Sequence, residues 1–281
     1  MPQTAVRHRP LPRTVPRQPV GELLRAWRKR RGLSQLDLAC EADISTRHVS
    51  FLETGRSQPS RTMLLHLAER MDIPLRDRNA LLAAAGFAPV FSEHQLGDPE
   101  MQAARQAVDL VLTGHEPHPA LAVDRHWTLV AANRAVAPLL TGAAPDLLQP
   151  PVNVLRLSLH PSGLAPRIEN FAQWQTHILH RLNRQIDISA DPVLAALYGE
   201  LKGYLVPDGQ APHSRSEPLS SHDGVVVPLR LRTEAGTLSF FSTTTVFGTA
   251  VDVTLSELAI EAFFPADLPT AQAMRQALAG L

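Results

Sequence analysis

Residues 33–56 constrain the fold more than any other stretch, because they read as two short helices joined by a tight turn. Ser34 is a good N-cap, and Leu36, Ala39 and Cys40 follow with i, i+3, i+4 spacing, which predicts the inward face of the first helix. A small residue such as Ala39 lets two helices cross closely. The pattern therefore predicts a helix-turn-helix in which Cys40 is buried as a small hydrophobe.

The second helix of this pair is predicted to begin after Ser45, its N-cap, with Val49 and Leu52 pointing inward. Its opposite face offers short hydroxyls and one guanidinium, which suit base edges in the major groove of DNA. Gly55 suits the left-handed residue that ends a helix, and donors suited to phosphates follow it. The predicted DNA-contacting residues are Ser45, Thr46, Arg47, Ser50, Arg56, Ser57 and Arg61.

The charge distribution supports a polyanionic partner for this region. Residues 1–90 contain 15 Lys and Arg against 8 Asp and Glu, a net charge of +7. Residues 91–281 contain 12 against 19, a net charge of −7. A basic flank beside a helix-turn-helix is typical of a DNA-binding protein, although an ordinary pair of packed helices is the alternative.

Two sequence runs, 32–35 and 44–56, are similar to the Xre family of phage-repressor-type helix-turn-helix regulators, and Pro59-Ser60 extends the likeness. The resemblance implies a five-helix, lambda-repressor-like domain. It also implies that Gln35 opens the second helix and holds a phosphate. Arg28 and Glu53 match a pair that forms a salt bridge inside such domains.

The 281 residues, 44% of them apolar, predict two domains with sizeable cores. The single cysteine cannot form an internal disulfide, and there is no run of about 18 apolar residues to span a membrane. No apolar segment follows the basic N-terminus, so a secretory signal is not expected. These features favour a cytoplasmic protein.

The first part of the chain is predicted to contain three regions. Residues 1–19, rich in proline and arginine, are expected to form a flexible basic arm, either without a role or adding contacts to DNA. Residues 20–88 are expected to form the helix-turn-helix domain. Residues 89–116 are expected to be a linker that contains a bridging helix over 98–113.

From residue 120 the pattern changes to short strands and helices, so the predicted fold class is α+β. A hairpin is predicted over 120–132, with Asn133 capping a helix that runs to Leu140. Further helices are expected over 152–159, 168–184 and 192–205, and strands over 225–232, 236–247 and 251–262. Residues 117–268 form the predicted domain, and 269–281 a terminal helix or tail.

Two strands, several helices and three strands are the order of a PAS-like domain, an antiparallel sheet with helices over one face and a cavity between. Phe240 and Phe241 alternate on their strand, so only one of them can line that cavity. Most of the aromatic residues are as readily explained by core packing. The candidate ligand-binding residues are Trp127, Asn133, Phe171, Trp174 and Phe240.

The phrases 123–127, 132–133 and 153–161 resemble the MmyB-type ligand-binding domain that often follows an Xre helix-turn-helix, and the run 247–267 agrees with a subset of that family. The resemblance implies a pocket for a small, largely apolar molecule such as a fatty acid. The general family ends in a basic and aromatic signature, which the run 247–267 replaces in this sequence. The resemblance therefore does not identify the ligand.

Catalytic and metal-binding patterns are weak. His177 and His180 share a helix face but have no carboxylate partner at a suitable offset, and the loop 115–118 is interrupted by proline. Residues 220–223 hold serine, histidine and aspartate side by side, which prevents the geometry of a triad. No Gly-rich phosphate loop is present. We therefore expect no enzyme activity, no metal and no cofactor.

Together these features predict a one-component transcription regulator that binds a palindromic operator as a homodimer. Its C-terminal domain is expected to bind a small apolar ligand, to dimerise, or to do both. The alternative is an antitoxin-like or purely dimerising DNA-binding protein without a small-molecule ligand.

Overall fold

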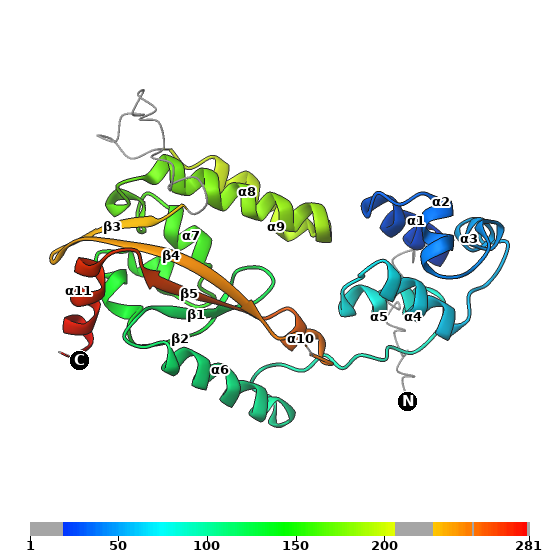
Figure 1. Cartoon of the computed structure of the whole chain (residues 1–281), viewed down its shortest axis with the longest axis horizontal. Coiled ribbons are helices and arrows are strands. Elements are labelled where there is room, and N and C mark those ends of the chain that lie inside the picture. The colour runs from blue at the N-terminus through cyan, green and yellow to red at the C-terminus, as the bar shows by residue number, and fades with distance from the viewer. Residues whose placement is uncertain (1–18, 206–226, 249, 280–281) are drawn as a thin grey trace, which may run out of the picture. The chain divides into compact units, whose positions relative to one another are not determined.

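The computed structural model describes residues 19–205, 227–248 and 250–279 (Figure 1). The chain divides into two compact units, Met1–Val90 and Phe91–Leu281, which we describe separately. The predicted arm over 1–19 lies outside the described residues except for Pro19, and the run 220–223 lies wholly outside them. No helix in the described part of the chain is long and apolar enough to cross a membrane.

The described part of the first unit is helical. Ser34, Ser45 and Ser60 each accept a hydrogen bond at the side-chain oxygen from a backbone N–H three residues further on, and so fix where α2, α3 and α4 begin. Gly55 has a φ of +71°, which ends α3 in the left-handed conformation. The helices are α1 Val20–Arg30, α2 Gln35–Glu41, α3 Thr46–Glu53, α4 Arg61–Arg70 and α5 Leu75–Ala84.

The inward face of α2 differs from the prediction. Leu38, Ala39 and Ala42 are buried, whereas Leu36 is 60% exposed and Cys40 is exposed. Ala39 lies at the border of two helix faces, the predicted one with Leu36 and Cys40 and another with Leu38 and Ala42. The face with Leu38 packs into the core shared with α3 and α4. The prediction that Cys40 is buried was therefore wrong.

Gly21 lets α1 approach α3 closely. A Cβ atom at this position would lie 2.4 Å from the carbonyl oxygen of Leu52, which is far inside van der Waals contact. Leu24 of α1 and Leu52 of α3 are both almost completely buried in the same core. The close contact explains why glycine occupies the first turn of α1, where an alanine would be the better helix former.

The second unit is built on a five-stranded antiparallel sheet of order β2-β1-β5-β4-β3 (Figure 1). The central strand β5 comes from the end of the chain and pairs with the N-terminal strand β1, with Ala120 opposite Ala262. The strands are β1 Ala120–Val123, β2 Leu129–Ala132, β3 Leu229–Thr233, β4 Gly236–Val246 and β5 Ala259–Pro265.

Helices cover both faces of this sheet, rather than one face as predicted. Alternation along β1 turns Leu121 and Val123 toward the core formed with α7, α8 and α9, and turns Ala120 and Ala122 toward α6. Figure 1 shows α6 and α8 on opposite sides of the sheet. The helices of this unit are α6 Gln102–Gly114, α7 Val154–Leu159, α8 Phe171–Ser189, α9 Pro192–Lys202, α10 Val253–Ser256 and α11 Leu268–Ala279. Short 3-10 helices span Pro99–Met101, Ala137–Leu140, Pro145–Leu148 and Ala165–Arg167.

Two segments predicted outside the second domain belong to its core. In α6, Val108 and Leu112 are buried against the sheet, so this helix is part of the second unit and not a linker helix. In α11, Met274 is buried against Leu238 and Phe240 of β4, so residues 269–279 are not a tail. In each case an amphipathic helix has an apolar face that the sheet covers.

Two local predictions were wrong. Asn133 caps no helix: its Oδ1 accepts a hydrogen bond from the Ala120 backbone, and only a short 3-10 helix follows, over Ala137–Leu140. The strand predicted over 251–262 begins only at Ala259, because Asp252 accepts hydrogen bonds from the backbone N–H groups of Thr254 and Leu255 and so starts α10.

Candidate DNA-binding surface and ligand cavity

The helix α3 presents the surface that the sequence predicts. Val49 and Leu52 are buried, which fixes which side of the helix faces the core. On the other side Arg47 is exposed, and Thr46 and Ser50 are half-buried. The hydroxyls and the guanidinium therefore reach the surface of the unit at the N-terminal half of α3.

Phe51 supports two of the predicted DNA-contacting arginines. The guanidinium carbon of Arg47 lies 5.1 Å from the centroid of the Phe51 ring, and that of Arg56 lies 5.8 Å from it. Both distances lie within the range of cation–π attraction. The sequence analysis missed this role of Phe51, although its i+4 spacing from Arg47 on a helix could have indicated it.

The other predicted contact residues surround α3 in the chain. Ser57 is half-buried and its backbone N–H donates to the carbonyl of Phe51, while Arg61 is exposed at the first residue of α4. Gln35 opens α2, and its Nε2 donates to Oε2 of Glu53 over 2.8 Å. An amide nitrogen has two N–H donors, and this bond uses one of them.

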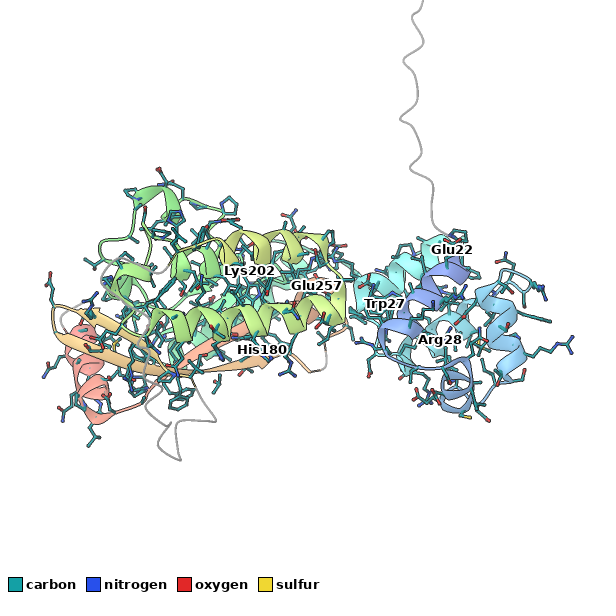
Figure 2. The ribbon with its side chains drawn as sticks, turned by 90° about the horizontal axis from the view of Figure 1, so that it is seen from above. Glu22, Trp27, Arg28, His180, Lys202 and Glu257 are labelled. Carbon is teal, nitrogen blue, oxygen red and sulfur yellow. The ribbon has the colours of Figure 1, made fainter. Side chains whose placement is uncertain are left out.

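Arg28 and Glu53, which the resemblance pairs, join α1 to α3 inside the unit; Figure 2 shows Arg28 on its helix. The Arg28 Nε lies 2.5 Å from Oε1 of Glu53, and Nη2 lies 3.0 Å from Oε2. Burial by itself raises the pKa of Glu53, but the hydrogen bonds from Arg28 and Gln35 outweigh it and leave this pKa below its ordinary value. The hydrogen bond to Glu53 raises the pKa of Arg28.

A cavity of about 110 Å³ lies in the second unit between the sheet and the helices α7 and α8. Each strand of the sheet contributes to its wall, and so does the 3-10 helix Ala137–Leu140. The lining is mainly apolar and includes Leu121, Trp127, Leu129, Leu139, Val154, Leu155, Trp174, Ile178, Leu229, Leu231, Phe240 and Phe263.

An ion pair, together with Ser158 and Ser242, forms the polar part of this wall. Arg181 of α8 donates through Nη1 and Nη2 to the two carboxylate oxygens of Glu261 on β5, over 2.9 and 2.5 Å. Its guanidinium carbon also lies 4.6 Å from the centroid of the Trp127 ring, and it donates to the Thr244 hydroxyl. The cavity therefore combines apolar walls with a charge that is already neutralised.

The structure brings three of the five predicted ligand-binding residues to the cavity, namely Trp127, Trp174 and Phe240. Phe171 is fully buried in the surrounding core and is not part of the lining. Asn133 does not line it either, because its side chain bonds the backbone of Leu112, His118 and Ala120. Phe240 and Phe241 lie on opposite faces of β4, and Phe241 stacks on Phe264 away from the cavity.

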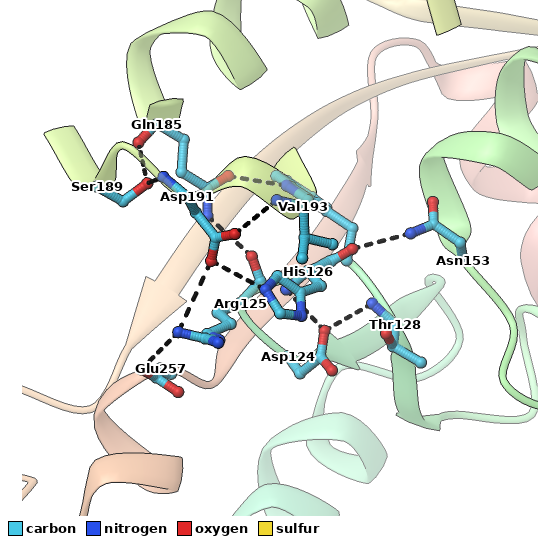
Figure 3. Close-up of polar contacts among 11 residues, drawn as sticks. Asp124, Arg125, His126, Thr128, Asn153, Gln185, Ser189, Asp191, Val193 and Glu257 are labelled. Atoms are coloured by element: carbon cyan, nitrogen blue, oxygen red, sulfur yellow. Dashed lines mark hydrogen bonds and ion pairs between the residues drawn. The ribbon is translucent and has the colours of Figure 1, made fainter. Parts of the chain in front are cut away.

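Figure 3 shows the polar contacts of the β1–β2 turn around His126 and Asp191, and the same turn holds Trp127. Its backbone is in the left-handed region, with a φ of +65°, and its Nε1 donates to Gln185 over 2.8 Å. The preceding His126 makes a hydrogen bond through Nε2 to Asp191 over 2.9 Å. Arg125 lies 3.7 Å from both Asp191 and Glu257. These contacts join the turn to the α8–α9 junction and to α10.

Asp191 is the centre of this network. Burial raises its pKa, but the hydrogen bonds from His126 and from the Val193 backbone outweigh that effect and leave the pKa below its ordinary value. The charged carboxylate is therefore the stable form, which keeps the turn and the ring of Trp127 in place.

The sequence analysis did not identify Arg181 and Glu261. They come from elements 80 residues apart that only the sheet topology brings together.

Two of the histidines considered as metal ligands, His115 and His177, have other partners, whereas the buried Nδ1 of His118 has no hydrogen-bond partner among the described residues. His115 makes a hydrogen bond to the carbonyl of Phe263, and His177 stacks on Trp174. Burial lowers the pKa of His118 and of His177, which favours their neutral forms. Among the described residues there is no group of three or more potential metal ligands.

The fold and these two regions define a class of protein: a helix-turn-helix DNA-binding unit followed by an α+β unit that contains an apolar cavity. The comparisons with known families agree. Residues 104–277 match the MmyB-like transcription regulator ligand binding domain, and residues 24–77 match a helix-turn-helix family. The chain belongs to the family of MmyB-like transcription regulators with an Xre-like helix-turn-helix. None of the curated proteins matches it.

Proposed function

We propose that the protein is a ligand-responsive, non-enzymatic transcription regulator that binds a palindromic operator as a homodimer. One observation carries the proposal. The outward face of α3 offers Arg47 and the hydroxyls of Thr46 and Ser50, while its inward face is anchored in the core. A single unit of this size contacts one half-site, so two protomers on half-sites about one helical turn apart suit the fold.

In this proposal Arg47 contacts a base edge and Arg56, Ser57 and Arg61 contact phosphates. Phe51 holds the two arginines beside it by cation–π contact. Gln35 is proposed to use its second N–H on a phosphate. The negative second unit contributes no DNA contact, because its net charge repels the phosphate backbone.

The cavity supports the ligand half of the proposal. Its walls suit a small, largely apolar molecule such as an acyl chain, with Trp127, Trp174 and Phe240 among the contacting residues. A ligand that favours one relative placement of the DNA-binding units of the two protomers must bind the dimer more tightly in that placement than in others. Such coupling typically changes operator affinity by about 1–3 kcal/mol.

The DNA half is tested with Arg47→Ala in the full-length protein. The variant should lose about 1–3 kcal/mol of binding free energy on its operator and relax the preference at one base position. Selection from a randomised site library gives both quantities. Arg70→Ala, which removes an equal charge from an exposed site on α4, is the matched control. Unaltered sequence preference in Arg47→Ala would contradict the assignment.

The ligand half is tested with Val154→Phe, which places a larger side chain into the cavity wall. Adding a total lipid extract should change the operator affinity of the wild type but not of this variant. Val130→Phe, on a strand residue outside the cavity lining, is the control. If the second unit only dimerises, the extract will leave wild-type affinity unchanged, and that result would contradict the ligand half of the proposal. A partner protein that copurifies with the chain would instead favour an antitoxin-like role.

A further inference from the structure

The strand β4 has two different halves along the edge that faces away from β5. Residues 236–240 pair there with β3, and this ladder ends where Leu229 lies opposite Phe240. Residues 241–246 pair with β5 alone, and Figure 1 shows β4 continuing past β3 toward α10. Among the described residues no strand lies beside residues 241–246 on this side, which we call the open edge.

The direction of the backbone groups shows which of them are free. The carbonyl of Ser239 accepts a hydrogen bond from the N–H of Ala266, which directly follows β5, so the backbone of Ser239 points toward that strand. Successive residues of a strand direct their N–H and C=O groups to alternate edges. The backbone groups of Ser242, Thr244 and Val246 therefore point to the open edge, and none of them has a hydrogen-bond partner among the described residues.

The outer strands of the sheet are bonded to other segments of the same unit. The N–H of Leu129 on β2 donates to the carbonyl of Val152, and the carbonyl of Arg230 on β3 accepts from the N–H of Glu169. An exposed row of unpaired N–H and C=O groups is a template for another strand. Within the described sheet, a strand can therefore still be added at the open edge.

The sequence of the open edge lacks the features that usually block such pairing. Residues 236–248 contain no charged residue and no proline, although charges and prolines are what protect the edges of natural sheets. Residues 243–246 are threonine or valine, which are favoured in strands, and all of them are exposed. The net charge of residues 91–281 is −7, so an uncharged surface is where two copies of this unit approach with the least repulsion.

The open edge is complementary to itself. When two identical strands pair antiparallel around a two-fold axis, the residue on the axis lies opposite its own copy. With Thr244 on the axis, Ser242 of each copy lies opposite Val246 of the other, and every outward N–H and C=O group of these residues finds a partner. Thr243 of each copy then lies opposite Thr245 of the other, which is a favourable cross-strand pair.

We propose that the open edge pairs with the same edge of a second copy, antiparallel and centred on Thr244, so that the two sheets join into one. Arg181, which donates to the Thr244 hydroxyl, is already paired with Glu261 and brings no unpaired charge to the axis. The contact has the two-fold symmetry that a palindromic operator requires. This inference rests on the proposed function, because it names the surface through which the proposed homodimer forms.

The open edge is too short to hold two copies together by itself. Stable interfaces bring together about 20–30 residues from each partner, whereas this edge offers residues 241–246. Two copies bound to neighbouring half-sites, however, meet at a high effective concentration, at which a weak contact is enough. We therefore expect the pairing between copies on DNA, where it is measured as cooperative binding to the two half-sites.

Amide hydrogen exchange of the full-length protein, resolved to single residues, tests the register. The amides of Ser242, Thr244 and Val246 should exchange freely in one copy bound to a single half-site, and should be protected when two copies occupy the operator. Those of Thr243 and Thr245 should be protected in both states, because they bond to β5. Protection of Thr244 on the single half-site would show that another part of the same chain covers the edge, and would overturn the inference. Free exchange of Thr244 on the full operator would overturn it as well.

An exchange of charges tests the identity of the partner. The double variant Thr243→Lys/Thr245→Lys places like charges opposite each other in two identical copies, and so does Thr243→Glu/Thr245→Glu. Each alone should reduce the cooperativity of operator binding by roughly twofold to thirtyfold, and an equimolar mixture of the two should restore it. The controls are Gln102→Lys/Gln106→Lys and Gln102→Glu/Gln106→Glu, which place the same charges at exposed positions of α6. Circular dichroism checks that each variant is folded.

The outcomes separate this inference from the proposed homodimer. If wild-type copies bind the two half-sites without cooperativity, the homodimer and the pairing of open edges both fail. If the wild type binds cooperatively and the variants at Thr243 and Thr245 do so equally well, the copies meet through another surface. The inference then fails and the homodimer stands. An equal loss in the controls on α6, or a mixture no more cooperative than its components, would also overturn the pairing.

Discussion

Each unit contains a buried glutamate that receives two hydrogen bonds from an arginine, and the two pairs differ in what surrounds them. In the first unit the side chains of Arg28 and Glu53 are 9% and 3% exposed, and Gln35 adds a third bond to the glutamate. In the second unit Arg181 is 28% exposed and borders the cavity, with Glu261 at 5%. The same interaction joins two helices in one unit and forms part of the wall of a cavity in the other.

The difference shows how a similar ion pair can serve two purposes. Removing Glu53 leaves the Arg28 guanidinium buried, with the backbone carbonyl of Leu33 as its remaining hydrogen-bond partner. Arg181, by contrast, also faces the Trp127 ring and the hydroxyl of Thr244, so loss of Glu261 leaves it partly compensated. We therefore expect the first pair to matter for stability and the second for the shape and polarity of the site.

The largest expected effect is that of Glu53→Gln, which leaves Arg28 buried without its carboxylate. The first unit should lose about 3–5 kcal/mol of its free energy of unfolding, the usual cost of breaking a buried ion pair. Hydrogen exchange of the amides in α1 and α3 measures this within the full chain. Arg28→Met should have an effect of similar size.

Lys29→Ala is the control for this prediction, since Lys29 is an exposed neighbour of Arg28 on α1. It should change stability by no more than about 0.5 kcal/mol. Equal losses for Glu53→Gln and Lys29→Ala would remove the distinction between the two pairs.

Glu261→Gln should have a smaller effect, confined to the second unit. We expect a loss of about 1.5–3 kcal/mol, typical of hydrogen bonds to charged groups, because Arg181 keeps its other contacts. Hydrogen exchange in α8 and β5 gives the value, and Glu234→Gln in the exposed turn is the control. A loss as large as that of Glu53→Gln would show that the second pair also serves mainly for stability.

The sequence predicted local features better than those that depend on how distant segments meet. The caps at Ser34 and Ser45, and the inward residues of α3, follow from short-range spacing. Arg28 and Glu53 could be paired only because the sequence resembles a known family. The inward face of α2 could not be chosen, because Ala39 belongs to two helical stripes and the choice depends on packing with α3 and α4.

The candidate ligand site could be predicted only in part, because it also depends on how distant segments of the chain meet. Trp174 and Phe240 lie on the apolar faces of their elements, so pattern alone places them near the cavity. Phe171 shares the apolar face of α8 with Trp174, and only the three-dimensional packing places it behind the cavity wall. Arg181 and Glu261 were missed because they are 80 residues apart, on elements that meet only through the strand order of the sheet.

A weaker effect is expected from Phe51→Leu, which tests whether an aromatic ring can support arginines in the first unit as Trp127 does in the second. The ring lies beside Arg47 and Arg56, so its loss should weaken operator binding by about 0.5–1 kcal/mol, the size of an exposed cation–π contact. Binding titrations with the selected operator measure the change. Phe87→Leu, at a partly buried core position, controls for loss of packing, and an equal effect on DNA would remove the role of Phe51.

Lowering the pH should reduce the free energy of unfolding of the first unit more than that of the second. The change per pH unit should be smaller than the effects described above. The folded-state pKa of Glu53 lies below its ordinary value of 4.5, so the ion pair contributes its full stability above that value. The contribution falls as the pH drops through the lower folded-state pKa. The difference in free energy of unfolding between the wild type and Glu53→Gln should therefore be constant near neutral pH and shrink below about pH 4.5.

The matched comparison in the second unit is Glu200, whose pKa the Arg156 guanidinium lowers to about 2. This pair lies at the surface, where ion pairs contribute about 0–1 kcal/mol, so Glu200→Gln should change acid stability little. Hydrogen exchange at a series of pH values, corrected for the intrinsic exchange rate, follows both units in one sample. We attribute the strength of the Arg28–Glu53 pair to its burial and not to the pairing itself. If Glu53→Gln and Glu200→Gln changed the pH dependence of unfolding equally, that explanation would be wrong.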